Sequence, residues 1–152
     1  MCNVNIDAVG TLENQKNIDD LLPHIYSQQA NMYEGLGDAK KAIELNKKGY
    51  EIRLLANPRD EPFCYGFESN IGYTHNTAND HESAMRWFEK ARDRWLEFVD
   101  KTGKKESYPS VLKKNMARCL VHMGKTAEAR PLLETAIAEF KSTKPLNWGM
   151  LA

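Results

Sequence analysis

The sequence predicts an all-α fold built from antiparallel helix pairs, on three observations. Three gapless blocks begin at Tyr26, Glu68 and Lys113, which are 42 and then 45 residues apart. Small residues recur at matching positions within the three blocks. A turn-forming residue lies in the middle of each block. No stretch alternates apolar and polar residues as a β-strand would. Because four columns keep the same offset, we interpret the blocks as an internal repeat.

The four recurring columns define two helices and a tight turn in each block. They are Ala30, Gly72 and Ala117 in the first helix; Gly37, Asn79 and Gly124 at the turn; and Ala42, Ala84 and Ala129, then Gly49, Ala91 and Ala136, in the second helix. Glycine and asparagine adopt the left-handed conformation that ends a helix, and Asp38 or Asp80 can cap the helix that follows.

Small residues are needed where two packed helices cross, because their axes lie only about 8–10 Å apart. We therefore expect Gly72 and Ala84 to meet at such a crossing. Phe88 and Trp95 are expected to fill the space where the two helices diverge.

The three helix pairs are expected over residues 22–56, 63–101 and 108–141. Apolar residues recur at helical spacing in every predicted helix. In the first helices they are Ile25, Met32 and Leu36; Phe67, Ile71 and Ala78; and Leu112, Met116, Leu120 and Met123. In the second helices they are Ala42, Leu45, Gly49 and Ile52; Ala84, Phe88, Ala91 and Trp95; and Ala129, Leu133, Ala136 and Phe140. Gln29 and Asn46 stand in columns that are apolar in the later blocks, so the first pair is expected to be the least well packed.

The segments outside the pairs are less regular. Residues 1–16 form an N-terminal arm or part of a helix, and residues 142–152 form a tail that Pro145 interrupts. Two connectors, 56–63 and 100–109, join the pairs, and the second is polar and is expected to be mobile.

The bulk composition excludes several classes of function. The 152 residues include 21 basic and 21 acidic side chains, so the formal net charge is zero. A nucleic-acid-binding protein or an electrostatic membrane anchor would normally carry a basic excess, so neither partner is expected. No apolar window is long enough to span a membrane, and the first residues do not resemble a signal peptide. Three widely spaced cysteines favour a reducing compartment, and we expect a cytoplasmic protein.

No motif indicates catalysis, a metal or a cofactor. His75 and His81 straddle a predicted turn, and no histidine or cysteine pair has metal-ligand spacing. Cys64 and Cys119 lie on predicted helices without a base beside them, and no glycine-rich phosphate loop is present. The sequence therefore predicts no enzyme, no metal site and no cofactor.

The spacing small-x11-Ala-x3-Phe-x2-Ala, seen at Gly72, Ala84, Phe88 and Ala91, resembles the tetratricopeptide repeat. The resemblance covers about residues 22–141, and the long period is similar to the kinesin-light-chain branch and to repeats associated with regulatory ATPases. It implies a right-handed α-solenoid of three repeats, about six helices, that acts as a protein-binding scaffold.

The resemblance places the binding surface on the concave side, which the first helices line. The predicted groove residues are Ser27, Asn31, Glu34, Ser69, Asn70, Tyr73, Asn76, Lys114, Asn115 and Arg118. Their amide and hydroxyl groups can bind a peptide backbone, and the two cations can bind a carboxylate. Some members clamp a C-terminal carboxylate with two asparagines and three cations. Here Asn31 and Asn70 match the asparagines, but Ser27, Val111 and Asn115 stand at the cation positions, which disfavours that ligand.

The expected partner is thus a protein or peptide segment. An alternative is an oligomerisation or regulatory segment of a larger signalling protein, a fragment of a longer repeat array, with a homo-oligomer formed through the C-terminal helix.

Overall fold

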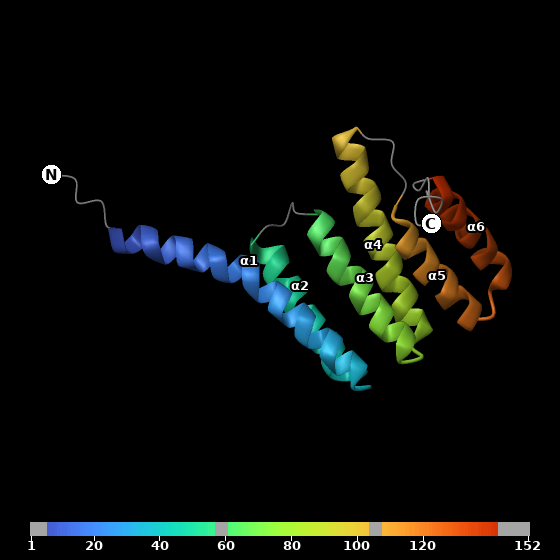
Figure 1. The fold of residues 1–152 in the computed structure, drawn as a ribbon, viewed down its shortest axis with the longest axis horizontal. Helices are drawn as coiled ribbons and strands as arrows, with labels where there is room; N and C mark the ends of the chain where they lie inside the picture. The colour runs from blue at the N-terminus through green and yellow to red at the C-terminus, as the bar shows by residue number, and fades with distance from the viewer. Residues whose placement is uncertain (1–5, 57–60, 104–107, 143–152) are drawn as a thin grey trace, which may run out of the picture.

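The computed structural model describes residues 6–56, 61–103 and 108–142, and every regular element in these ranges is an α-helix. The helices are α1 (Ile6–Gly35), α2 (Ala39–Ala56), α3 (Glu61–Thr77), α4 (His81–Thr102), α5 (Ser110–His122) and α6 (Thr126–Ser142). Helices α1 and α2, α3 and α4, and α5 and α6 pack as pairs, and the pairs adjoin through α2–α3 and α4–α5. Figure 1 shows them in a row, with α1 at one end and α6 at the other. The predicted all-α class is confirmed.

Three turns of one design close the helix pairs. Gly37, Asn79 and Gly124 have positive φ angles of 81°, 63° and 76°. In each turn the next amide donates to the carbonyl five residues earlier, at 2.9, 2.9 and 2.8 Å, as in a Schellman motif. Asp38 and Asp80 then accept from the backbone amides of Lys41 and Ser83, at 3.0 and 3.2 Å, so both predicted N-caps are confirmed.

The predicted close crossing lies between α3 and α4. A Cβ atom on Gly72 would lie 2.7 Å from two atoms of the Phe88 ring and 3.2 Å from the backbone oxygen of Ala84. Phe88 and Ala84 are fully buried. Trp95, further along α4, is half-buried, and its ring centroid lies 5.2 Å from that of Tyr65. A small residue is therefore required at Gly72, because the ring and backbone that face it leave no room for a side chain.

Two of the predicted apolar faces are exposed. On α1, Ile25, Met32 and Leu36 are 44%, 68% and 78% exposed. On α6, Leu133 and Phe140 are 36% and 59% exposed. The reason is their place in the row. The faces lie at its two ends, where no further helix of the described residues packs against them.

Helix α1 begins earlier than the first predicted pair and continues without interruption through residue 16. Pro23 lies inside it and is buried, and a proline within a helix removes a backbone hydrogen bond and bends the axis. Figure 1 shows α1 bending along its length, with its N-terminal part extending away from the other helices.

The first pair contains the polar defect that the sequence predicts. Asn46 stands where α4 has Phe88, and its side chain is 2% exposed. Its amide oxygen accepts no hydrogen bond from the described residues. Gln29 is exposed. A buried polar atom without a partner destabilises the fold, so this pair is less well packed at that position.

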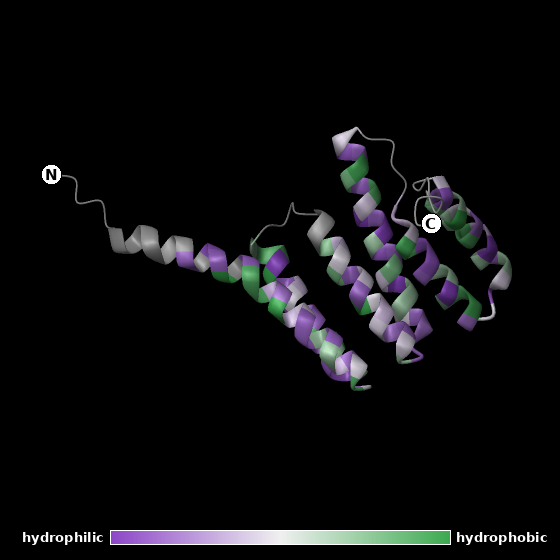
Figure 2. Ribbon diagram, viewed as in Figure 1, coloured by the Kyte–Doolittle hydropathy of each residue, from purple (hydrophilic) through white to green (hydrophobic). Residues whose placement is uncertain are grey.

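Parts of both predicted connectors, and the predicted tail with Pro145, lie outside the described residues. Among the described helices, none combines the length and apolarity needed to cross a bilayer. Figure 2 shows hydrophilic and hydrophobic residues interspersed along them.

Candidate functional site

A hollow of about 230 Å³ lies where α1, α3 and α5 face one another. Its lining consists of Asn31, Glu34, Ser69, Asn70, Tyr73, Val111 and Asn115. Six of these seven residues are predicted groove residues. Three helices that are far apart in the sequence therefore bring most of the predicted site into one depression.

The hollow combines fixed polar groups with accessible ones. Ser69 and Asn115 are each only 8% exposed, whereas Asn31 and Asn70 are exposed. Glu34 is held in place because Thr77 of α3 donates a hydrogen bond to its carboxylate, at 3.2 Å. This bond also links α1 to α3 at the site. Amide groups on rigid helices can pair with a peptide backbone at little ordering cost to the protein.

One cation flanks the hollow. The guanidinium carbon of Arg118 lies 5.0 Å from the ring centroid of Tyr73, which is a cation–π contact between α5 and α3. Arg118 is exposed and Tyr73 is half-buried. The ring holds the guanidinium beside the depression, and its donors can still reach a ligand. The site thus has an acidic group, Glu34, on α1 and a basic group on α5.

Four predicted groove residues do not line this hollow: Arg118 flanks it, and the other three lie elsewhere. Ser27 is half-buried on α1. Asn76 is buried, and its amide oxygen lies 2.7 Å from Nδ1 of His81, so it belongs to the α3–α4 turn. Lys114 lines a different hollow, together with residues of α6. The sequence pattern predicted which helix each residue lies on. It did not predict where the side chains point, because contacts with neighbouring turns and helices determine their direction.

Val111 is a lining residue that was not predicted as part of the groove. It lies one helical turn before Asn115, so the spacing of α5 places the two on one face. That spacing was a usable signal, but the apolar side chain was not counted with the polar groove.

A buried charge network, which the sequence analysis missed, joins α2, α3 and α4. Glu68 is fully buried and accepts two hydrogen bonds of 2.9 Å from Nε of Arg94. The hydroxyl of Tyr50 donates to the same carboxylate at 2.7 Å. Burial, and then the hydrogen bond to Glu68, raise the pKa of Tyr50. The network is closed by its own partners, so we assign it to structure.

The third pair has the reversed charges at the corresponding positions. Lys113 follows Glu68 by 45 residues and Glu139 follows Arg94 by 45 residues. The Lys113 ammonium lies 2.6 Å from Oε2 of Glu139 and is almost fully buried. Hydrogen bonds from Lys113 and then Ser110 lower the pKa of Glu139. The same two repeat positions therefore hold an acidic and then a basic residue in the second helix pair, and a basic and then an acidic residue in the third.

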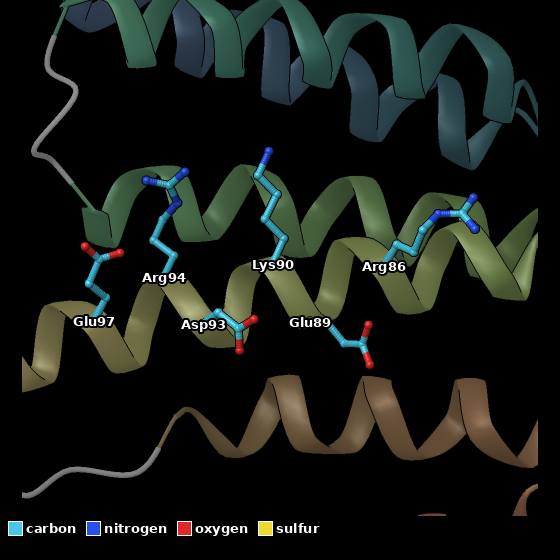
Figure 3. A pocket seen from close by; sticks show the side chains of 6 residues that line it. All are labelled: Arg86, Glu89, Lys90, Asp93, Arg94 and Glu97. Carbon is cyan, nitrogen blue, oxygen red and sulfur yellow. The ribbon is translucent and has the colours of Figure 1, made fainter.

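The outer face of α4 has a larger and more open hollow of about 480 Å³, lined entirely by charged residues. Figure 3 shows Arg86, Lys90 and Arg94 in one row, and Glu89 turned toward α5. The three cations already have contacts. Arg86 binds Ser83, Lys90 lies over the Trp87 ring, and Arg94 binds Glu68. A charged, solvated surface of this kind is a weaker candidate than the α1–α3–α5 hollow.

Three histidines and Cys119 have structural contacts. Nδ1 of His75 lies 3.0 Å from Oδ2 of Asp80. The ring centroids of His81 and His122 are 4.9 Å apart with nearly parallel planes, a stacked arrangement. The thiol of Cys119 donates to the carbonyl of His81, and burial raises its pKa, which disfavours the nucleophilic thiolate. Among the residues that the structure describes, no three or more His, Cys, Asp or Glu side chains gather as a metal site would require.

A scan against protein-family models gives no match for this chain. A search of curated proteins gives no match either.

Proposed function

We propose that this protein is a non-enzymatic scaffold that binds an extended peptide or protein segment in the hollow between α1, α3 and α5. The observation that carries the proposal is the convergence of Asn31, Ser69, Asn70 and Asn115 from three helices. Side-chain amides offer both donors and acceptors, which suits an extended backbone of any sequence. Catalysis has no comparable support.

The proposed architecture is a right-handed, tetratricopeptide-like α-solenoid of three repeats. Its support is the repetition of geometry: three turns with the same hydrogen bonds, and small buried residues in each of the three recurring helical columns. The reversed ion pairs Glu68–Arg94 and Lys113–Glu139 add a second correspondence at the same offset. In such a solenoid the first helices line the concave side, and the residues of the hollow come from α1, α3 and α5, the first helices of the three pairs.

The charges of the site favour a ligand with an acidic side chain or a carboxylate on the α5 side. Arg118 is exposed and oriented by Tyr73, and it can form a two-bonded contact with a carboxylate. Glu34 lies on the opposite, α1 side of the hollow and would repel that group. The ligand is therefore expected to have a polarity, with its acidic end toward α5.

The test is a fluorescence-anisotropy screen with a peptide library that includes acidic, neutral and basic members. For any peptide found, Asn70→Ala is expected to weaken binding about fivefold or more, because a lost hydrogen bond costs about 1–3 kcal/mol when a polar group is left unpaired. Arg118→Glu is expected to weaken acidic peptides selectively. Asn17→Ala and Arg86→Glu change exposed residues outside the hollow and are the matched controls. Equal effects of the site and control variants would reject the assignment.

A further inference from the structure

Both ends of the helix row expose positions that are buried inside it. On α1, Ile25 and Met32 are 44% and 68% exposed. The residues 42 positions later, Phe67 and Thr74, are 7% and 1% exposed, because α3 packs against α2. The residues a further 45 positions along, Leu112 and Cys119 on α5, are fully buried. Helix α1 therefore has the surface of a helix that packs on a preceding pair, but no described helix occupies that side.

The exposed apolar residues of α1 lie along one side of the helix in a stripe that Gln28 and Gln29 interrupt, and we call it the α1 stripe. Its members are Ile18, Leu21, Ile25, Met32 and Leu36, which are 44–78% exposed. Steps of three, four and seven residues place them on one side of the helix. A stripe of this length on a soluble protein marks an interaction surface.

The opposite end of the row shows the complementary defect, which we call the α5–α6 face. Leu133 is 36% exposed, whereas Phe88 and Asn46, 45 and 87 residues earlier, are at most 2% exposed. Ile137 and Val111 are 54% and 60% exposed. Leu133, Ile137 and Val111 line an apolar hollow of about 350 Å³ between α5 and α6.

The charges of the two ends are also complementary. Helix α1 contains five acidic residues and one basic residue, Lys16. The lining of the apolar hollow on the α5–α6 face includes Lys114 and Lys141 and no acidic residue. The net negative charge of α1 and these two lysines favour the approach of the two ends.

We infer that a second copy of this chain fills each exposed end, with the α1 stripe of one molecule packed on the α5–α6 face of the next. The junction would repeat the contacts that α2 makes with α3 and α4 makes with α5 inside one molecule. Because the two surfaces are different, the contact is heterologous and does not close on itself at two copies. Molecules are expected to add head to tail and to extend the row of helix pairs.

The experiment is analytical ultracentrifugation of the full chain at low salt over a wide concentration range. One variant, Ile25→Lys/Met32→Lys, disables the α1 stripe by placing positive charge opposite the basic face. The other, Leu133→Glu/Ile137→Glu, disables the α5–α6 face by placing negative charge opposite the acidic helix. Leu55→Glu, at a residue on α2 that is 84% exposed and outside both surfaces, is the control. Circular dichroism confirms that every variant remains helical.

We expect the wild type and the control to increase in average mass beyond a dimer as concentration rises. Each face variant alone is expected to remain a monomer. An equimolar mixture of the two variants is expected to form a one-to-one complex and nothing larger, because each variant supplies the surface that the other lacks.

Several results would overturn the inference. A wild type that stays monomeric throughout would do so, and so would a mixture that does not associate. If either face variant still forms dimers, the contact is between like surfaces instead. If only a form truncated after Ser142 associates, residues 143–152 cover the α5–α6 face within one molecule.

Discussion

Replacing Gly72 by alanine tests whether close helix approach explains the recurring small residues. A helix gains about 1 kcal/mol from Gly→Ala when the new methyl group meets nothing. At Gly72 the methyl would lie 2.7 Å from the Phe88 ring and 3.2 Å from the backbone of Ala84, both fully buried. Overpacking of a buried site costs about 1–3 kcal/mol. The expected result is a free energy of unfolding lower than wild type by up to about 2 kcal/mol.

Gly66 provides a matched control in the same helix, because a Cβ atom there meets nothing within 4 Å. Gly66→Ala is expected to stabilise the protein by about 1 kcal/mol. The difference between the two variants removes the helix-propensity contribution and measures the packing penalty alone. Urea unfolding followed by far-UV circular dichroism gives both free energies. The penalty at Gly72 should shrink in a Phe88→Leu background, and a Gly72→Ala variant as stable as Gly66→Ala would refute the reasoning.

Three further perturbations test other contacts. Asn46→Leu should raise the free energy of unfolding by about 1–3 kcal/mol, because it removes a buried amide oxygen without a partner; a lower denaturation midpoint would show that the amide is needed. Arg94→Met should lower stability by up to about 3–5 kcal/mol, since it removes the guanidinium and leaves the buried carboxylate of Glu68 with the Tyr50 hydroxyl and the Lys90 ammonium at 3.9 Å, and adding Glu68→Gln should recover much of the loss in a double-mutant cycle. Lys113 and Ser110 lower the pKa of Glu139. The contribution of Glu139 to the free energy of unfolding should therefore be complete above the ordinary carboxyl pKa of 4.5 and be lost as pH falls through the lowered pKa. Between pH 3 and 7 the free energy of unfolding should fall less steeply with acid for Glu139→Gln than for the wild type, and parallel slopes would contradict the assignment.

Much of the candidate site could be predicted from the sequence because helical periodicity determines which residues share a face. Asn31, Asn70 and Asn115 were placed on one surface by that reasoning, and all three line the hollow. Asn76 was misplaced because His81, across a turn, binds its amide. Val111 was matched to a cation position of the resembled carboxylate clamp, but it was not counted as a groove residue because it is apolar.

The sequence by itself determined the helices, the turns and the positions of close packing. These features depend on backbone conformation and side-chain size, which are local properties: glycine and asparagine at the turns, and glycine or alanine where axes approach. Only the tertiary structure decided which apolar faces are covered. Ile25 and Phe67 belong to the same column, yet they are 44% and 7% exposed, because α2 packs on α3 and no described helix packs on that side of α1. Burial depends on neighbours that are distant in the sequence. The ion pair between Glu68 and Arg94 depends on them too, because Glu68 lies on α3 and Arg94 on α4.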